Sequence, residues 1–177
     1  SAASDVYKRQ AYQRAYPHTH LHMRQLNSRE AQNHVVQGHA ELAIVEGNWV
    51  AHELHQRVVG HDELVVVVPA AHRWADTKNP RQPSDSEVST SAPEIAAVTK
   101  EELQSTPLVL REHGSGTREV VADVLGMLAS PAGEFGSLGA QRTAIGALGA
   151  PGIIARRAVA SQLETGCLLY TSDAADE

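Results

Sequence analysis

The sequence predicts an α/β fold built from two halves, and three observations predict it. Short apolar runs typical of buried strands recur along the chain, patterns of helical period follow most of them, and a Pro- and Ser-rich stretch interrupts the series. A strand, a helix and a strand in succession make the unit of a parallel sheet, which helices cover on both faces. We therefore expect two α/β subdomains separated by an irregular crossing.

The two ends of the chain look foreign to that fold. Residues 1–10 (SAASDVYKRQ) can be encoded by a DNA string whose reverse complement, read one base later, encodes CLLYTSDAA, and the chain ends in CLLYTSDAADE. Two unrelated termini would not be antisense translations of each other. We therefore interpret 1–10 and 167–177 as adapter-derived tails outside the fold, and we take 11–166 as the natural segment.

The first half is predicted to be a strand, a helix and a strand. Polar and apolar residues alternate over 19–26 (THLHMRQL), which indicates a strand with one wetter face. Asn27 stands three residues before Glu30, which is typical of a helix start, and Gly38 suits the end of that helix. The apolar run 41–47 (ELAIVEG) indicates a buried strand that ends in glycine.

Two more strands are expected before the composition changes. They lie at 54–59 (LHQRVV) and 63–69 (ELVVVVP), and the second is apolar on both faces, as in a sheet covered on each side. The segment that follows, 76–98, is rich in Pro and Ser, and Val88 is the only large apolar residue up to Glu94. Such a segment cannot bury enough surface to offset the entropy of ordering, so we expect a flexible insertion.

The second half alternates again between helical and extended patterns. Valines and leucines recur at helical spacing after the Gly-Ser-Gly stretch, and Gly149 suits the end of a later helix. The expected elements, in order, are a helical turn at 99–103, a strand at 107–112, helices at 117–128 and 138–148, a strand at 152–155 and a helix at 156–166.

Charge and cysteine content limit the function classes. The segment 11–166 holds 13 Lys and Arg against 17 Asp and Glu, a net charge of −4, which argues against a nucleic-acid-binding face. The only cysteine, Cys167, lies in the terminal tail. The natural segment therefore has no disulfide and no Cys-containing metal site. It also has no apolar run of roughly 18 residues, the length that a membrane span needs.

The stretch LREHGSGTREV, residues 110–120, is the clearest candidate for a binding site. A strand, a Gly-Ser-Gly turn and a helix start in succession present free backbone N–H groups at the positive end of a helix dipole. Ser115 and Thr117 add hydroxyl groups, and Arg118 adds a charge that can bind an anion. The pattern indicates either a clamp for a carboxylate, phosphate or sulfate, or only a capped turn.

Catalytic and metal-binding interpretations are weaker. The stretch matches neither the phosphate-binding loop with its lysine nor the G-x-S-x-G turn, and a nucleophilic Ser115 would need a base oriented by a third group. His18, His20 and His22 would share one strand face, but neither a cysteine nor a carboxylate stands near them to complete a metal site. The polar helix start at Asn27 repeats the features of the Gly-Ser-Gly turn, and two such helix starts suit a cleft between two lobes.

Longer stretches resemble a known family. YPHTHLHMRQLNSREAQNHVVQGHAELAIVEG and DELVVVVPAAHRWA resemble the first half of the effector-binding domain of LysR-type transcriptional regulators. EELQSTPLVLREHGSGTREVVADVL and GSLGAQRTAIGALGAPGIIARRAVASQLETG resemble its second half. The resemblance implies two α/β subdomains of the type 2 periplasmic-binding-protein kind, at 11–68 and 69–166, with a ligand cleft between them and with no cofactor or metal.

The resemblance also implies the site and the role of the domain. Effector-binding residues would come from a helix start, a strand end and the Gly-Ser-Gly turn: Asn27, Ser28, Glu46, Gly47, Ser115, Gly116, Thr117 and Arg118. The effector would be a small anionic metabolite. In the family a first strand and most of a helix precede the position of Ala11, so we expect 11–166 alone to aggregate or to be only marginally stable.

The implied whole protein is a cytoplasmic bacterial regulator without catalytic residues. It would be a homodimer or homotetramer that contacts DNA only through an upstream helix-turn-helix, which this segment lacks, and it would not contact a membrane. Two alternatives share the fold. One is an extracytoplasmic solute-binding receptor, and the other is a prephenate-dehydratase-like lyase, for which His113 and Glu46 are the candidate acids or bases.

Overall fold

The computed structural model describes residues 10–75 and 98–171 and contains one mixed five-stranded sheet. The strand order is β3-β2-β4-β1-β5. β2 runs parallel to β3 and β4, whereas β1 runs antiparallel to β4 and β5. The strands are β1 (Leu64–Pro69), β2 (Val109–Arg111), β3 (Gly133–Phe135), β4 (Gly152–Ala155) and β5 (Leu168–Thr171). The predicted insertion at 76–98 lies, apart from Val98, outside the described residues.

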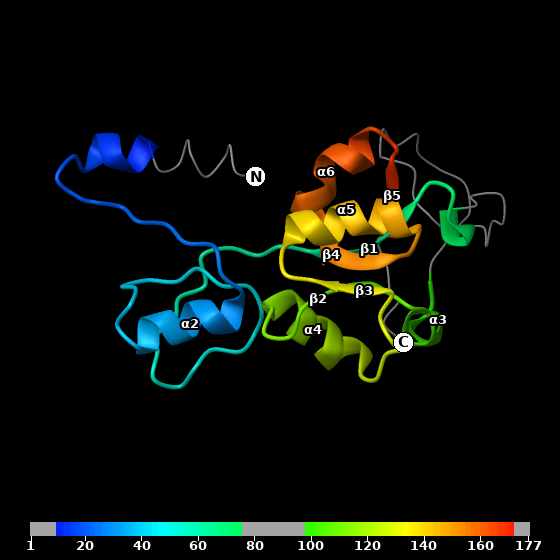
Figure 1. Ribbon diagram of the computed structural model, residues 1–177, viewed down its shortest axis with the longest axis horizontal. Helices are drawn as coiled ribbons and strands as arrows, with labels where there is room; N and C mark the ends of the chain where they lie inside the picture. The colour runs from blue at the N-terminus through cyan, green and yellow to red at the C-terminus, as the bar shows by residue number, and fades with distance from the viewer. Residues whose placement is uncertain (1–9, 76–97, 172–177) are drawn as a thin grey trace, which may run out of the picture.

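Helices cover both faces of this sheet (Figure 1). They are α3 (Lys100–Ser105), α4 (Gly116–Leu125), α5 (Leu138–Leu148) and α6 (Arg156–Glu164), with a short 3₁₀ turn, η1 (Arg73–Ala75), after β1. A further helix, α2 (Ser28–Val36), stands apart from the sheet, and residues 10–15 are helical as well.

The apolar run of β1 divides its side chains between two cores. Val66 and Val68 pack in one cluster with Leu103 of α3 and Val121 of α4. Val65 and Val67 pack in the other cluster with residues of α5 and α6. Successive side chains of a strand point to opposite faces, so a strand that is apolar throughout requires both helical layers. The prediction of a strand covered on both sides is confirmed here.

Most predicted elements of the second half form where the sequence placed them. α5 spans Leu138–Leu148, and Gly149 ends it with the positive φ of 64° that glycine adopts most easily. α3 begins at a capping box formed by Thr99 and Glu102. β4 covers the predicted strand at 152–155, and α6 follows it directly.

Three of the four strands predicted in the first half are wrong, whereas the fourth, at 63–69, forms β1. Residues 19–26, 41–47 and 54–59 form no strand in the structure, and only α2 is regular between Leu21 and Glu63. A two-stranded unit is marginal without a further neighbour, and within the described residues these segments have no strand to pair with. A side chain orders the backbone instead, because the Gln32 amide donates to the Trp49 carbonyl oxygen (3.2 Å) and accepts from the Ala51 N–H (2.7 Å).

The sheet also takes in two segments that the sequence prediction placed elsewhere. Residues 64–68, assigned to the first subdomain, form β1, which pairs with β4 from Leu64 opposite Ala155 onward. The terminal tail at 167–177 supplies β5, whose Leu168, Leu169 and Tyr170 are buried against the sheet. Its apolar run Leu168–Tyr170 fits the open edge of β1, so residues 168–171 belong to the sheet.

One buried side chain connects β2 and β4 where their backbones pair at a single position, Val109 opposite Gly152. Gln141 of α5 is fully buried, and its Nε2 donates to the carbonyl oxygens of Val109 (3.1 Å) and Ile153 (2.9 Å). A buried carbonyl group without a donor costs about 1–3 kcal/mol. The helix above the sheet therefore completes the hydrogen bonding of its centre.

We predict that Gln141→Ala lowers the free energy of unfolding by about 2–4 kcal/mol, because it removes this donor from two carbonyl groups and leaves a cavity. Chemical denaturation monitored by circular dichroism measures the change. Gln162→Ala on α6, where the side chain is only partly buried, is the matched control and should change stability by about 0.5 kcal/mol or less. Equal effects of the two substitutions would contradict the assigned role.

Candidate functional site

The N-termini of α2 and α4 meet at the centre of the molecule (Figure 1). The chain enters α2 at Asn27, whose side chain accepts from the Glu30 N–H at 2.9 Å and caps the helix. Arg29, in the first turn of α2, donates its backbone N–H to the Gly114 carbonyl oxygen at 3.0 Å. Two positive helix ends therefore face one region, the arrangement that the two polar helix starts in the sequence indicated.

A contact between two glycines fixes how closely the ends approach. A Cβ atom on Gly47 would lie 2.9 Å from Gly116 Cα, and a Cβ atom on Gly116 would collide with the Glu46 carbonyl oxygen. Gly47 also has a φ of 99°, which residues with side chains rarely adopt. The structure therefore requires glycine at both positions, and we call this meeting point the Gly47–Gly116 contact.

Side chains join the same two segments by hydrogen bonds. Ser28 Oγ accepts from the Gly116 N–H at 3.2 Å and donates to the Glu46 carbonyl oxygen at 3.2 Å. Thr117 Oγ1 donates to Glu46 Oε2 at 2.9 Å. Residues separated by 71 to 88 positions in the sequence thus form one network around the Gly47–Gly116 contact.

A cavity of about 630 Å³, which we call the cleft, opens beside this network. Of the predicted site residues, Asn27, Ser28, Glu46 and Ser115 line it, while Gly47, Gly116 and Thr117 lie in the adjoining contact. Ser115 is the N-cap of α4, yet its side chain makes no capping hydrogen bond and the residue is only 2% exposed. A buried hydroxyl group that lines a cavity without a capping bond is available to a ligand.

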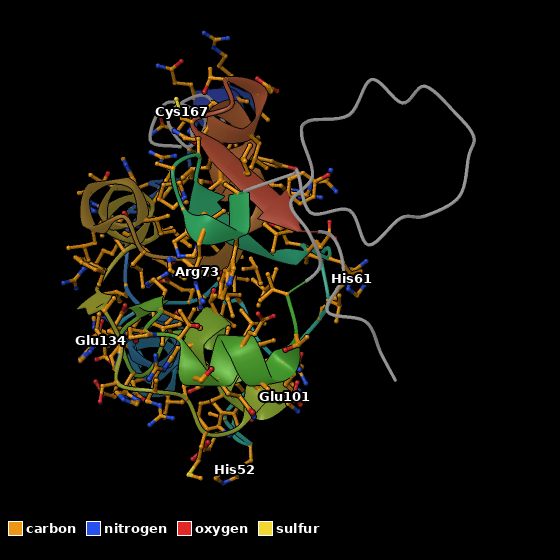
Figure 2. All side chains as sticks on the ribbon, turned by 90° about the vertical axis from the view of Figure 1, so that its right-hand side faces the viewer. His52, His61, Arg73, Glu101, Glu134 and Cys167 are labelled. Carbon is orange, nitrogen blue, oxygen red and sulfur yellow. The ribbon has the colours of Figure 1, made fainter. Side chains whose placement is uncertain are left out.

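Arg118 lies elsewhere. Its guanidinium approaches Glu134 of β3 at 3.5 Å (Figure 2 labels Glu134), and the residue lines a second cavity of about 340 Å³ with His113 and Ser130. Residues 115 to 118 open a helix, where successive side chains point in different directions. The sequence showed that Arg118 follows the turn, but it could not show on which side of α4 the guanidinium emerges.

The cationic side chain in the cleft is Arg111, which the sequence analysis missed. Arg111 is 8% exposed, and it donates to Glu112 Oε2 from Nε (2.9 Å) and to Oε1 from Nη2 (3.1 Å). Arg111 ends β2, Glu112 follows it, and both line the cleft. The adjacent pair Arg111–Glu112, one residue before the Gly-Ser-Gly turn, was the available signal, since the carboxyl ends of parallel strands are where α/β proteins bind ligands.

The surroundings of Glu112 favour its charged form. Burial by itself raises the pKa of this carboxyl group, but hydrogen bonds from Arg111 and from the backbone, the charge of Arg111 and a hydrogen bond with Asn27 together hold the pKa below its ordinary value of 4.5. Asn27 belongs to the α2 cap and Glu112 follows β2, so the two residues reach the cleft from different segments.

The histidines do not assemble a metal site among residues 10–75 and 98–171. No group of three His, Cys, Asp or Glu side chains that could hold a metal ion is found there. His18, His20 and His22 are exposed on a segment that forms no strand, and His52 and His61 lie well apart (Figure 2).

Sequence comparison with known proteins points to one family. Residues 9–87 match the family of LysR substrate binding domains. An uncharacterised HTH-type transcriptional regulator of Mycobacterium tuberculosis (strain H37Rv) is 35% identical over 150 residues, which cover 81% of this chain and 43% of that protein. The chain therefore spans less than half the length of such relatives.

Solved structures show the same fold. The regulatory domain of CcmR from Synechocystis PCC6803, in complex with 2-PG, superposes with a TM-score of 0.70 and 18% identity, covering 95% of this chain and 74% of that one. A phosphate ABC transporter substrate-binding protein of Clostridium perfringens, with bound phosphate, gives a TM-score of 0.61 and 14% identity over 82% of this chain and 63% of that one. The predicted periplasmic-binding-protein-like α/β fold is confirmed.

We predict that Gly116→Ala destabilises the chain by about 1–3 kcal/mol, because the new methyl group collides with the Glu46 carbonyl oxygen and forces the two helix ends apart. Hydrogen exchange should show faster exchange of the Arg29 amide. Gly146→Ala, within α5 and with open space around it, is the control and should be neutral or stabilising. Unchanged exchange at Arg29 in Gly116→Ala would refute the contact.

The ion pair with Arg111 predicts a pH dependence. Because the pKa of Glu112 is lower in the folded chain, its contribution to stability is present above about pH 4.5 and is lost as the pH falls through the folded pKa. Glu112→Gln should therefore lower the melting temperature at pH 7, and the difference from the unmodified chain should shrink below pH 4.5. Melts between pH 3 and 7 measure this, with exposed Glu41→Gln as the matched control. A difference that persists unchanged at pH 3 would contradict the role of the charge.

Proposed function

The chain belongs to the LysR substrate-binding domain family, and we propose that it binds a small metabolite with an anionic group in the cleft, as the effector-binding part of a LysR-type transcriptional regulator. The observation that carries the proposal is Ser115: its hydroxyl group is buried, makes no capping hydrogen bond and lines the cleft at the N-terminus of α4. An anionic group there would accept from this hydroxyl group and from free N–H groups of the helix end.

The backbone supports the same placement. Of the first N–H groups of α4, that of Gly116 is used by Ser28, whereas no acceptor is found among the described residues for those of Thr117 and Arg118. Two proteins of the same fold were solved with ligands, one with 2-PG and one with phosphate. Both ligands were bound by those proteins and not by this chain, but their presence supports the proposal that this fold holds a small-molecule site.

Signalling would follow from the position of the cleft between two segments. A ligand that touches both the α2 side and the α4 side changes the equilibrium between open and closed arrangements only through its differential affinity for them. In the whole regulator, a homodimer or homotetramer in the cytoplasm, this shift would change the contact with DNA made by a separate domain. No helix among the described residues has the length and apolar character of a membrane span.

The alternative functions have less support. Glu46 accepts a hydrogen bond from Thr117, and His113 has an exposed side chain outside the cleft, so neither candidate is poised as the acid or base of a lyase. A solute-binding receptor shares the fold, as the phosphate-binding neighbour illustrates. The relative with 35% identity is a transcriptional regulator, which favours the regulatory function.

Thermal shift of the 177-residue chain against small carboxylates, phosphates and sulfur oxyanions tests the proposal. At least one anion should raise the melting temperature, since a ligand that binds only the folded state stabilises it. Ser115→Ala should weaken that binding about tenfold or more, the equivalent of one hydrogen bond to a charged group. Ser161→Ala, an exposed serine on α6, should leave it unchanged. If no anion raises the melting temperature, or if Ser115→Ala has no effect, the proposal fails.

A further inference from the structure

The cleft carries more negative charge than a site for a simple anion should. Its lining includes three carboxylates, Glu30, Glu46 and Glu112, against one cation, Arg111. Both carboxylate oxygens of Glu112 accept from Arg111, so this pair is neutral as a unit. Glu30 and Glu46 are left, and neither forms an ion pair with any described residue. Both residues are exposed to solvent, which screens their charge, yet the lining offers a ligand that brings only negative charge no cation other than the paired Arg111.

Glu46 is held in place for a ligand contact. Its carbonyl oxygen accepts from Ser28, its neighbour Gly47 packs on Gly116, and its Oε2 accepts from Thr117. Among the described residues no hydrogen bond or ion pair uses its other oxygen, Oε1. This carboxylate with a free oxygen and the buried Ser115 hydroxyl group line the same cavity, so the cleft presents both an acceptor and a donor.

We propose that the effector is a zwitterion, an inference that rests on the proposed function. Its anionic group would bind at Ser115 and the α4 N-terminus, and its ammonium group would bind to Glu46. An ammonium ion offers three donors and a compact positive charge, which suits a carboxylate that lacks a cation. The cleft volume of about 630 Å³ is ample for a molecule of amino-acid size.

Matched pairs of amino acids and hydroxy acids isolate the ammonium group. L-Alanine with L-lactate, L-aspartate with L-malate and L-glutamate with L-2-hydroxyglutarate differ only in that group. Calorimetric titration of the 177-residue chain should show an amino acid that binds more tightly than its hydroxy partner. Glu46→Gln should reduce this preference roughly tenfold, the loss of one charge-assisted contact. The amide oxygen introduced by Glu46→Gln can still accept the hydrogen bond from Thr117, so the surrounding network is kept.

Glu41→Gln is the control, because it removes the same charge from an exposed residue outside the cleft. A hydroxy acid that binds as tightly as its amino acid, or a preference that survives Glu46→Gln, overturns the zwitterion inference and leaves the proposed function standing. If none of the amino acids, hydroxy acids or simple anions binds, the proposed function fails and the inference fails with it. An amino-acid preference lost in Glu46→Gln but kept in Glu41→Gln supports both.

Discussion

The close approach of Gly116 to the backbone of Glu46 and Gly47 is the constraint on which the site depends. Only glycine at these positions lets the two backbones touch, since a Cβ atom on Gly116 would collide with the Glu46 carbonyl oxygen. The contact places Ser28 within reach of Gly116 and Thr117 within reach of Glu46. It thereby brings a helix that lies outside the sheet against a helix that covers it, and the cleft exists because the two helix ends meet.

The chemistry of the cleft depends on which polar groups already have a hydrogen-bond partner within the chain and which do not. Capping and network hydrogen bonds use Asn27, Ser28 and Thr117, and the bidentate pair with Glu112 uses Arg111. The Ser115 hydroxyl group and one oxygen of Glu46 are not used in this way. A site that offers free donors, the Ser115 hydroxyl group and N–H groups of α4, together with free carboxylate oxygens would discriminate ligands by the charges at both of their ends.

The sequence predicted local structure better than it predicted which strands pair with one another. α5 and its glycine stop, the cap at Asn27 and the doubly covered strand β1 were predictable because each depends on neighbouring residues or on an apolar pattern. The strands predicted at 19–26 and 41–47 were wrong, because a strand needs a partner that no local pattern reveals. The sheet position of Leu168–Thr171 and the bridge made by Gln141 were missed for the same reason. In the site, Ser115 was singled out by the Gly-Ser-Gly pattern and Glu46 by the resemblance, whereas Arg111 was hidden among the apolar residues of β2.

The most direct test of a ligand site between α2 and α4 is a ¹H–¹⁵N NMR titration of the chain with the anion or amino acid that binds it most tightly. The structure predicts that the largest shifts fall on the amides of Ser28, Ser115 and Thr117, which come from both sides of the cleft. Shifts confined to one side, or centred on Ala129 and Ser130 in the second cavity, would contradict it.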